Sequence, residues 1–157
     1  MAGRVYTVTF ENVAVTVAQD LFEITPADDK PVEIIGLSVS QSTELGDAAE
    51  EQLRIQIIRG HTTSGSGGTA PTPVPVNPND TAAGFTAEVN NTTIASVGTT
   101  TIPYSKTFNV RVGLDEWFPQ ETEPKAGQGN TTIVVRLLAA PADSITMGGT
   151  LWVREVY

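Results

Sequence analysis

Residues 53–80, LRIQIIRGHTTSGSGGTAPTPVPVNPND, decide the fold class because they join a strand pattern to a long segment without one. In the first part, Leu53, Ile55 and Ile57 alternate with polar residues, which is the period of a half-buried strand. The second part is rich in Gly, Ser, Thr and Pro and shows neither a helix nor a strand period. Loops of this length are uncommon in compact domains and are usually functional or disordered. The stretch predicts a β-domain with one long Gly/Pro-rich loop over about residues 61–80.

Residue choice in the rest of the chain predicts an all-β fold. With 22 Thr, 17 Val and 10 Ile, 49 of the 157 residues are β-branched and suit a pleated strand better than a helix. Short strands separated by turn residues are typical of an antiparallel β-sandwich, and we expect a jelly roll in a single domain over residues 1–157. Only residues 43–52 could hold a helical turn or two. Alternating apolar residues mark the expected strands at 6–10, 13–17, 35–39, 53–57, 108–114, 133–137 and 151–153.

Composition limits the classes of partner. Nine Lys and Arg against 18 Asp and Glu give a net charge of −9, and the basic patch of a nucleic-acid-binding protein is missing. The beginning of the chain, MAGRVYTVTF, lacks the features of a signal peptide, and no run approaches the ~20 apolar residues that span a bilayer. The chain has no cysteine, so disulfides cannot stabilise it. We expect a soluble protein made in the cytoplasm, without a nucleic acid or membrane partner.

Two patterns suggest ligand chemistry, and in each the sequence context argues against it. Residues 65–70 match the glycine fingerprint of dinucleotide-binding loops, but Pro71 and Pro73 follow where that fingerprint requires a helix. A group of acidic residues between positions 44 and 51 is the second pattern. It lacks the spacing of an EF-hand loop and is typical of a solvated turn. We therefore predict no cofactor and no metal. The acidic residues in question are Glu44, Asp47, Glu50 and Glu51.

Catalytic signals are equally weak. Asp115 and Glu116 beside Trp117 resemble a glycosidase site only superficially, because that chemistry needs two carboxylates at a fixed separation. His61 is the only histidine, and no Gly-x-Ser-x-Gly nucleophile turn accompanies it. We predict a protein that binds or builds, not an enzyme.

Aromatic and basic residues supply the remaining candidates. Trp117 and Phe118 fall in a predicted turn before Pro119, where aromatic side chains often anchor partner contacts. A loop that folds back over the core would give the same sequence, and both interpretations stay open. Four arginines lie at alternating positions in predicted strands, where we expect outward-facing side chains, with ion pairs across a subunit contact as the alternative. These are Arg54, Arg111, Arg136 and Arg154.

Three segments resemble a family of small virion proteins of tailed bacteriophages. They are FENVAVTVAQDLFEITPADDKPVEIIGLSVSQST at 10–43, EEQLRIQIIRGHTTSGSGG at 50–68 and VVRLLAAPADSITMGGTLWVREVY at 134–157. The resemblance covers nearly the whole chain and brings no catalytic motif. It implies a capsid decoration (cement) protein, a class in which β-sandwiches and trimers on the shell recur. The implied partner is the major capsid protein and the implied location is the capsid surface of the virion.

On this hypothesis the long loop is an adhesive arm that orders on a neighbouring capsomer, and its prolines lower the entropy cost by keeping the free segment extended. A homo-oligomer, with a trimer favoured, would bind through several weak copies. Two alternatives remain: another virion component of the tail, connector or fibre, and a carbohydrate-binding β-sandwich module with Trp117 and Phe118 as its stacking platform. The candidate contact residues are Arg4, His61, Pro71, Pro73, Pro75, Trp117 and Phe118.

Overall fold

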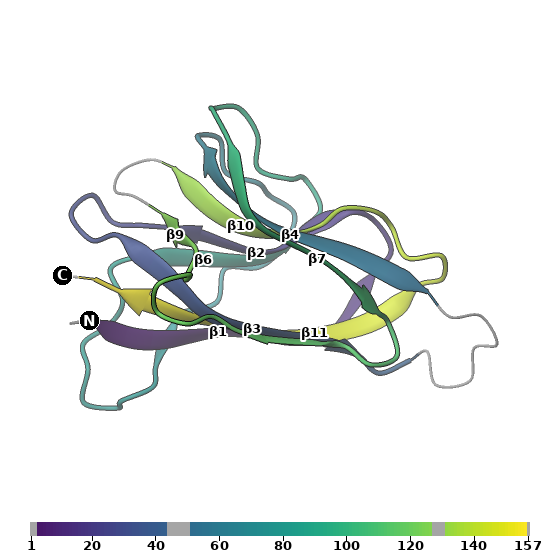
Figure 1. The fold of residues 1–157 in the computed structure, drawn as a ribbon, viewed down its shortest axis with the longest axis horizontal. Coiled ribbons are helices and arrows are strands. Elements are labelled where there is room, and N and C mark those ends of the chain that lie inside the picture. The colour runs from purple at the N-terminus through teal and green to yellow at the C-terminus, as the bar shows by residue number, and fades with distance from the viewer. Residues whose placement is uncertain (1–2, 44–50, 127–130, 157) are drawn as a thin grey trace.

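The fold is a sandwich of two antiparallel sheets, which confirms the predicted class (Figure 1). The structure, a computed structural model, describes residues 3–43, 51–126 and 131–156. Within these ranges the regular elements are all strands. The candidate helical turn at 43–52 falls mostly outside the described residues, as do three of the four acidic residues near it.

The two sheets have different strand orders. Sheet A has the order β5-β1-β11-β3-β8, with β9 also paired to β3, and sheet B has the order β6-β2-β10-β4-β7. Sheet A contains β1 (Arg4–Val15), β3 (Val32–Gln41), β5 (Val74–Pro75), β8 (Leu114–Trp117), β9 (Lys125–Ala126) and β11 (Ile145–Glu155). Sheet B contains β2 (Gln19–Thr25), β4 (Gln52–His61), β6 (Thr86–Asn91), β7 (Thr101–Asn109) and β10 (Thr132–Leu137).

The core fills the space between the sheets with the inward-facing residues of both. Phe10 of β1 meets Phe22 of β2 with ring centroids 5.3 Å apart, and Tyr6 meets Phe85 edge-on. Each fully buried apolar side chain of this kind contributes about 1.5–3 kcal/mol. The fully buried large side chains come from both layers and include Tyr6, Ile34, Leu37, Ile145, Met147, Phe22, Ile24, Ile55, Ile57, Ile133 and Leu137.

Two of the predicted strands are wrong in detail. The run at 35–39 predicted Ile35 on the core face, but the register between β3 and β11 shifts there and Ile34 takes the buried position. The run at 108–114 predicted one strand, but a turn interrupts it, and Gly113 in that turn has a φ of 77°. Val112 in the turn is 83 % exposed. Bulges and turns change which side chains face inward while the apolar alternation in the sequence continues.

The segment at 61–80, predicted as a free loop, lies along the body. Isolated bridges pair Thr63 with Ser96, Ser66 with Thr93 and Thr69 with Val89. The segment then forms β5, the outermost strand of sheet A, and the Val76 N–H donates to the Val5 carbonyl at 2.9 Å. Backbone hydrogen bonds along this length favour a covering layer over a free arm.

The prolines of this segment occupy alternate positions along the edge of sheet A. Pro75 stands opposite Tyr6, and its neighbour Val74 stands opposite Thr7 of β1. Pro71, Pro73 and Pro75 are half-buried, whereas the residues between and after them are exposed. The prolines therefore pack toward the protein, and Val74 and Val76 present their side chains to solvent.

Candidate interaction surfaces

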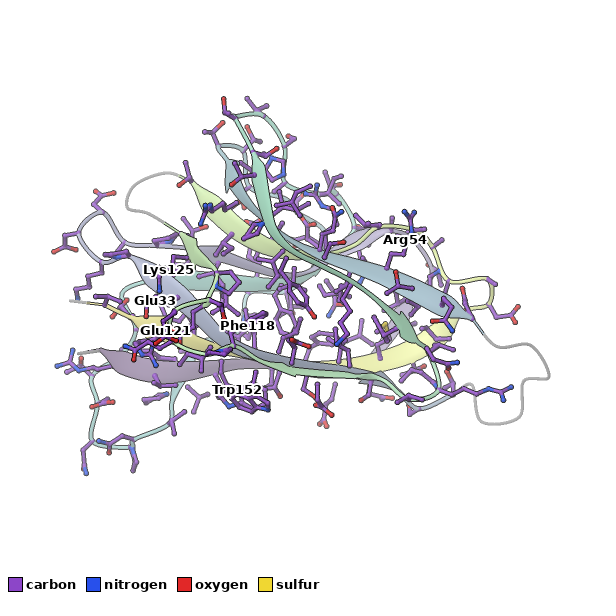
Figure 2. All side chains as sticks on the ribbon, in the orientation of Figure 1. Glu33, Arg54, Phe118, Glu121, Lys125 and Trp152 are labelled. Carbon is purple, nitrogen blue, oxygen red and sulfur yellow. The ribbon has the colours of Figure 1, made fainter. Side chains whose placement is uncertain are left out.

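An aromatic row crosses the outer face of sheet A. Register pairs Thr7 with Trp152, Trp152 with Gly36, and Gly36 with Trp117, so these residues share one face of four neighbouring strands. The rings of Trp117 and Trp152 lie 4.5 Å apart between centroids at an angle of 44°. Figure 2 shows Trp152 on the side of sheet A that faces away from sheet B. We call Trp117 and Trp152 the aromatic row.

Gly36 sets the position of the Trp117 ring. A Cβ atom added to Gly36 would lie 2.6 Å from a carbon of that ring, so the indole lies directly over the glycine. Trp117 is nevertheless 58 % exposed. The ring is therefore supported from below by the sheet and from one edge by Trp152, and much of its surface is open to solvent.

Charged side chains lie on one side of the aromatic row, further along β11 and β3 toward Arg154 and Glu33 (Figure 2). Arg154 donates to Glu33 at 2.8 Å and to Glu123 at 2.6 Å, and Lys125 donates to Glu33 at 2.9 Å. Burial alone would raise the pKa of Glu33, but hydrogen bonds from Lys125 and Arg154 lower it overall, whereas burial raises the pKa of Glu123. Arg154 lies on the same outer face of sheet A as Trp152, as the sequence predicted, and is a partly buried member of an intramolecular ion-pair network.

A polar hollow lies on the opposite side of the aromatic row from these charged side chains. Its volume is about 630 Å³, and a smaller hollow of about 270 Å³ continues from it along β3 and β11. The hollow forms where Gly148 has no side chain and where the β1–β11 register shifts opposite it, with Asn12 at a φ of 57°. Its lining consists of Thr9, Phe10, Glu11, Ser38, Ser40, Gly148, Gly149 and Thr150.

A second apolar surface lies on the opposite side of the molecule. The loop between β6 and β7, residues 92–100, projects from sheet B away from sheet A (Figure 1), and we call it the tip loop. Val97 is 67 % exposed and Ile94 is 41 % exposed, and Ile102 at the start of β7 is 51 % exposed. Val97 has a φ of 63°, which is unfavourable for a β-branched residue because its Cβ crowds the backbone.

His61 holds the tip loop in this conformation. Its Nδ1 lies 3.1 Å from the Val97 carbonyl oxygen, which accepts the hydrogen bond. Gly98, with a φ of 86°, packs against the Gly60 carbonyl, and Gly60 packs against the Thr99 carbonyl so closely that neither site has room for a Cβ. His61 itself is buried, which favours a role in positioning the tip loop over direct contact with a partner.

A buried ion pair anchors the base of the tip loop. The Asp20 carboxylate accepts from Arg136 Nε at 2.6 Å and from the Ala95 N–H at 2.8 Å. Arg136 also donates to the Ala95 carbonyl at 3.0 Å. Asp20 is fully buried. Arg136 leaves β10 on the face away from the core, as the sequence predicted, but the base of the tip loop covers it and its side chain is only 13 % exposed. Beside the ion pair lies a small apolar cluster formed by Ile58, Ala95 and Val134.

Two glutamates hold the neighbouring glycine-rich segment. Glu23 and Glu88 stand opposite each other on β2 and β6, and the Ser64 hydroxyl lies within hydrogen-bond distance of both, at 2.9 Å from Glu88. Glu23 also accepts from the Gly65 N–H at 2.9 Å, and Asn91 donates to Glu88 at 3.0 Å.

Burial raises the pKa of Glu23. For Glu88, burial alone would raise the pKa, but hydrogen bonds from Glu23, Ser64 and Asn91 lower it overall. One hydroxyl proton cannot serve two carboxylates, so the ionised form of both glutamates together is disfavoured.

The structure separates the candidate contact residues. Trp117 lies at the end of β8 and not in a turn, and it is exposed. Phe118 turns inward, packs against the core and meets Tyr104 edge-on at 5.1 Å, as in the second interpretation of the sequence. Arg4 lies 3.8 Å from Asp80, at the opposite edge of sheet A from Trp117.

Sequence reasoning missed Val97, Ile94 and Trp152. The one available signal is the uncharged run from residue 89 to 105, which stands out in a chain of net charge −9.

The described ranges hold no group of three or more His, Asp or Glu that could bind a metal ion. They also contain no helix of the length and hydrophobicity that a membrane span requires. Comparisons with known proteins find no matching family, no matching curated protein and no matching solved structure. Function must therefore be argued from these surfaces.

Proposed function

We propose that this protein is a non-enzymatic structural protein of a tailed-phage virion, which binds the outside of the capsid shell and reinforces contacts between capsomers. Its partner is the major capsid protein, and the tip loop makes the contact. The phage resemblance of the sequence supports the virion part of this proposal. The observation that carries the binding part is Val97, which is exposed and held in the left-handed backbone region.

Val97 indicates binding because the fold gains little from this residue. A left-handed conformation costs a β-branched residue about 1–2 kcal/mol, and Asn or Gly would adopt it at lower cost. The exposed side chain recovers almost nothing by burial within the chain. Strain of this kind persists where the surrounding structure enforces it, and it concentrates at functional sites. We infer that an apolar socket on the partner receives this side chain.

The tip loop is also prepared for binding before it meets a partner. His61 fixes the Val97 carbonyl, and the Asp20–Arg136 pair fixes Ala95 two residues earlier. A loop already ordered loses less conformational entropy on association than a free arm would. The proline-containing segment is also ordered, against β1, so the exposed and strained Val97 is what favours the tip loop as the principal contact.

The winding of the strands is compatible with this role. Sheet A contains the series β1-β11-β3-β8 and sheet B the series β2-β10-β4-β7, so chain neighbours β1 and β2, β3 and β4, and β10 and β11 lie in opposite sheets. We infer that these eight strands are wound as a jelly roll, with β5 and β6 added at the edges. A homotrimer would present three tip loops, and several weak contacts would then add up to stable attachment.

Quantitative mass spectrometry of purified virions tests the location. A copy number near that of the major capsid protein supports decoration of the shell, whereas a few copies per hundred capsid proteins would place the protein in the tail or connector. Complete absence from the particle would overturn the proposal.

Co-sedimentation with undecorated shells tests the contact. Val97→Asp should reduce the bound fraction at least about ten-fold, because Asp tolerates the left-handed backbone but cannot enter an apolar socket. Val112→Asp is the matched control, since Val112 is also an exposed valine and lies in a different turn. Equal binding of both variants would contradict a role for the tip loop.

A further inference from the structure

We propose that the outer face of sheet A binds a neutral oligosaccharide, with one sugar ring stacked on Trp117 and the following units in the hollow beside the aromatic row. This activity goes beyond attachment to the shell and uses a different surface.

The Trp117 ring has the geometry of a stacking platform. It lies over Gly36, it is braced by Trp152 at 4.5 Å, and it is 58 % exposed. A hexopyranose has one face made mainly of C–H groups, and such a face packs on a flat aromatic ring through the apolar and quadrupole contacts that favour aromatic surfaces. The sheet orders the ring in advance, so stacking does not require the side chain to be immobilised on binding.

The hollow supplies hydrogen-bond partners directly beside the platform. Thr150 and Ser38 pair with Thr9 and Asp115 in the row of residues next to the tryptophans on the same face of the sheet. Hydroxyls can both donate and accept, and carboxylates accept, which matches the hydroxyl rim of a sugar. Within the part of the chain that the structure describes, the side-chain hydroxyls of Thr9, Ser38 and Thr150 have no hydrogen-bond partner.

The length and charge of the hollow define the class of ligand. From the level of Gly36, where the aromatic row lies, to that of Ser42, the aromatic row and the two hollows together follow β3 for about 20 Å, at about 3.3 Å per residue. This length suits a short chain of sugar units. The net charge of −9, together with Glu11 in the lining, disfavours sulfated, phosphorylated or uronic acid chains. The ligand is therefore a neutral glycan of hexose or N-acetylhexosamine units.

The tip loop projects from sheet B (Figure 1), whereas Trp152 of the aromatic row lies on the opposite side of the sandwich, on the outer face of sheet A (Figure 2). A protein attached through the tip loop would consequently keep the outer face of sheet A directed away from the shell. Glycan binding at this face can therefore occur on free and attached protein alike.

The test is a titration of the isolated full chain with maltohexaose, cellohexaose and chitohexaose up to millimolar concentration. The chain has two tryptophans, and both lie in the aromatic row, so intrinsic tryptophan fluorescence reports on this site alone. Saturation-transfer difference NMR provides a second readout on the sugar protons in every variant. We expect a saturable change with at least one of the three oligosaccharides.

Three variants localise the binding. Trp117→Ala should weaken it roughly ten-fold or more, as expected when one stacked ring is lost, whereas Trp117→Phe should retain part of it. Gly148→Val should abolish binding by filling the hollow; the nearest backbone atom to an added Cβ there is the Phe10 carbonyl oxygen at 3.3 Å, so the fold can adjust. Val112→Ala, which removes an exposed apolar side chain elsewhere, should leave the affinity unchanged.

The outcomes separate this inference from the proposed function. Absence of binding to all three oligosaccharides would overturn it, as would binding that Trp117→Ala and Gly148→Val leave intact. If Trp117→Ala lowers shell binding and no sugar binds, the face is a protein contact and the glycan proposal is wrong. Val97→Asp should leave sugar binding unchanged, so failure of the tip-loop experiment does not affect this test.

Discussion

The aromatic row and the tip loop both present apolar side chains to solvent, but different forces hold them. Trp117 and Trp152 lie in regular strands, where the backbone ladder of sheet A fixes their position. Val97 lies in a loop with a left-handed backbone and depends on His61 and the buried Asp20–Arg136 pair below it. A sheet can display a side chain without internal support, whereas an irregular loop needs buried polar groups to remain ordered. The tip loop should therefore be the more fragile of the two surfaces.

The largest expected effect follows from removing the buried ion pair. Arg136→Met leaves the fully buried Asp20 carboxylate without its cationic partner and should lower the free energy of unfolding by about 3–5 kcal/mol. Hydrogen exchange should increase over the tip loop, while tryptophan fluorescence from the aromatic row stays constant below the unfolding transition.

Arg54→Met is the control for this prediction, because Arg54 is an exposed arginine of the same sheet (Figure 2). Its expected change is within about 0.5 kcal/mol in urea unfolding. Similar losses in both variants would show that the ion pair has no special role in holding the tip loop.

Relief of the strain at Val97 should have an effect of opposite sign. Val97→Asn replaces a β-branched residue with one that tolerates the left-handed region, and it should raise the free energy of unfolding by about 1 kcal/mol. Shell binding should fall at the same time because the apolar side chain is gone. A variant that is less stable than wild type would show that the Val97 side chain stabilises the fold, which would remove the strain argument.

A smaller effect is expected when the support of the aromatic row is changed. Gly36→Ala places a Cβ 2.6 Å from the Trp117 ring, so the ring must lift from the sheet. Stability should change by less than about 1 kcal/mol, because Ala is otherwise the better strand residue. Tryptophan emission should shift toward that of a more solvated ring. Gly148→Ala, where the nearest atom to the added Cβ is 3.3 Å away, should leave the emission unchanged.

The smallest expected effect is a change in pH dependence. Burial raises the pKa of Glu23, so the folded state binds this proton more tightly than the unfolded state does. The stabilising contribution is present below the ordinary value of 4.5 and is lost as the pH rises from there through the raised pKa. Glu23→Gln cannot lose a proton, so its stability relative to wild type should increase as the pH rises from 4.5 toward neutrality. Urea unfolding at a series of pH values measures this, and parallel profiles of the two proteins would contradict it.

The sequence predicts the sandwich but not the details that create the surfaces. Alternation of β-branched residues identifies strands because both layers bury one face. The same alternation continues through Val110 and Val112, so the turn that Gly113 closes is hidden in it. Turns with two left-handed residues usually carry Asn-Gly, and Val97–Gly98 does not show that signal.

The candidate contact residues differ in the same way, because local sequence identifies some of them and not others. Trp117 could be selected because it lies with Phe118 directly before Pro119, a local pattern in which aromatic side chains often anchor partner contacts. The burial of His61 could not be predicted from the sequence. It depends on a contact with Val97 far along the chain, and no local pattern indicates such a pairing. The prolines stand out in the sequence, but their place against β1 depends on tertiary pairing.

The spacing of those prolines has a consequence for crowding. The backbone N–H of Val76 points toward β1, and the register shows that the N–H of Val74 does the same. The residues whose N–H groups would point away from β1 are therefore Pro73 and Pro75. Proline has no backbone N–H. Along β5 the edge of sheet A can therefore accept hydrogen bonds but not donate them, which hinders a neighbouring strand from extending the sheet there. In the proposed role, where many copies are held side by side at high local concentration, this disfavours the growth of fibres along β5.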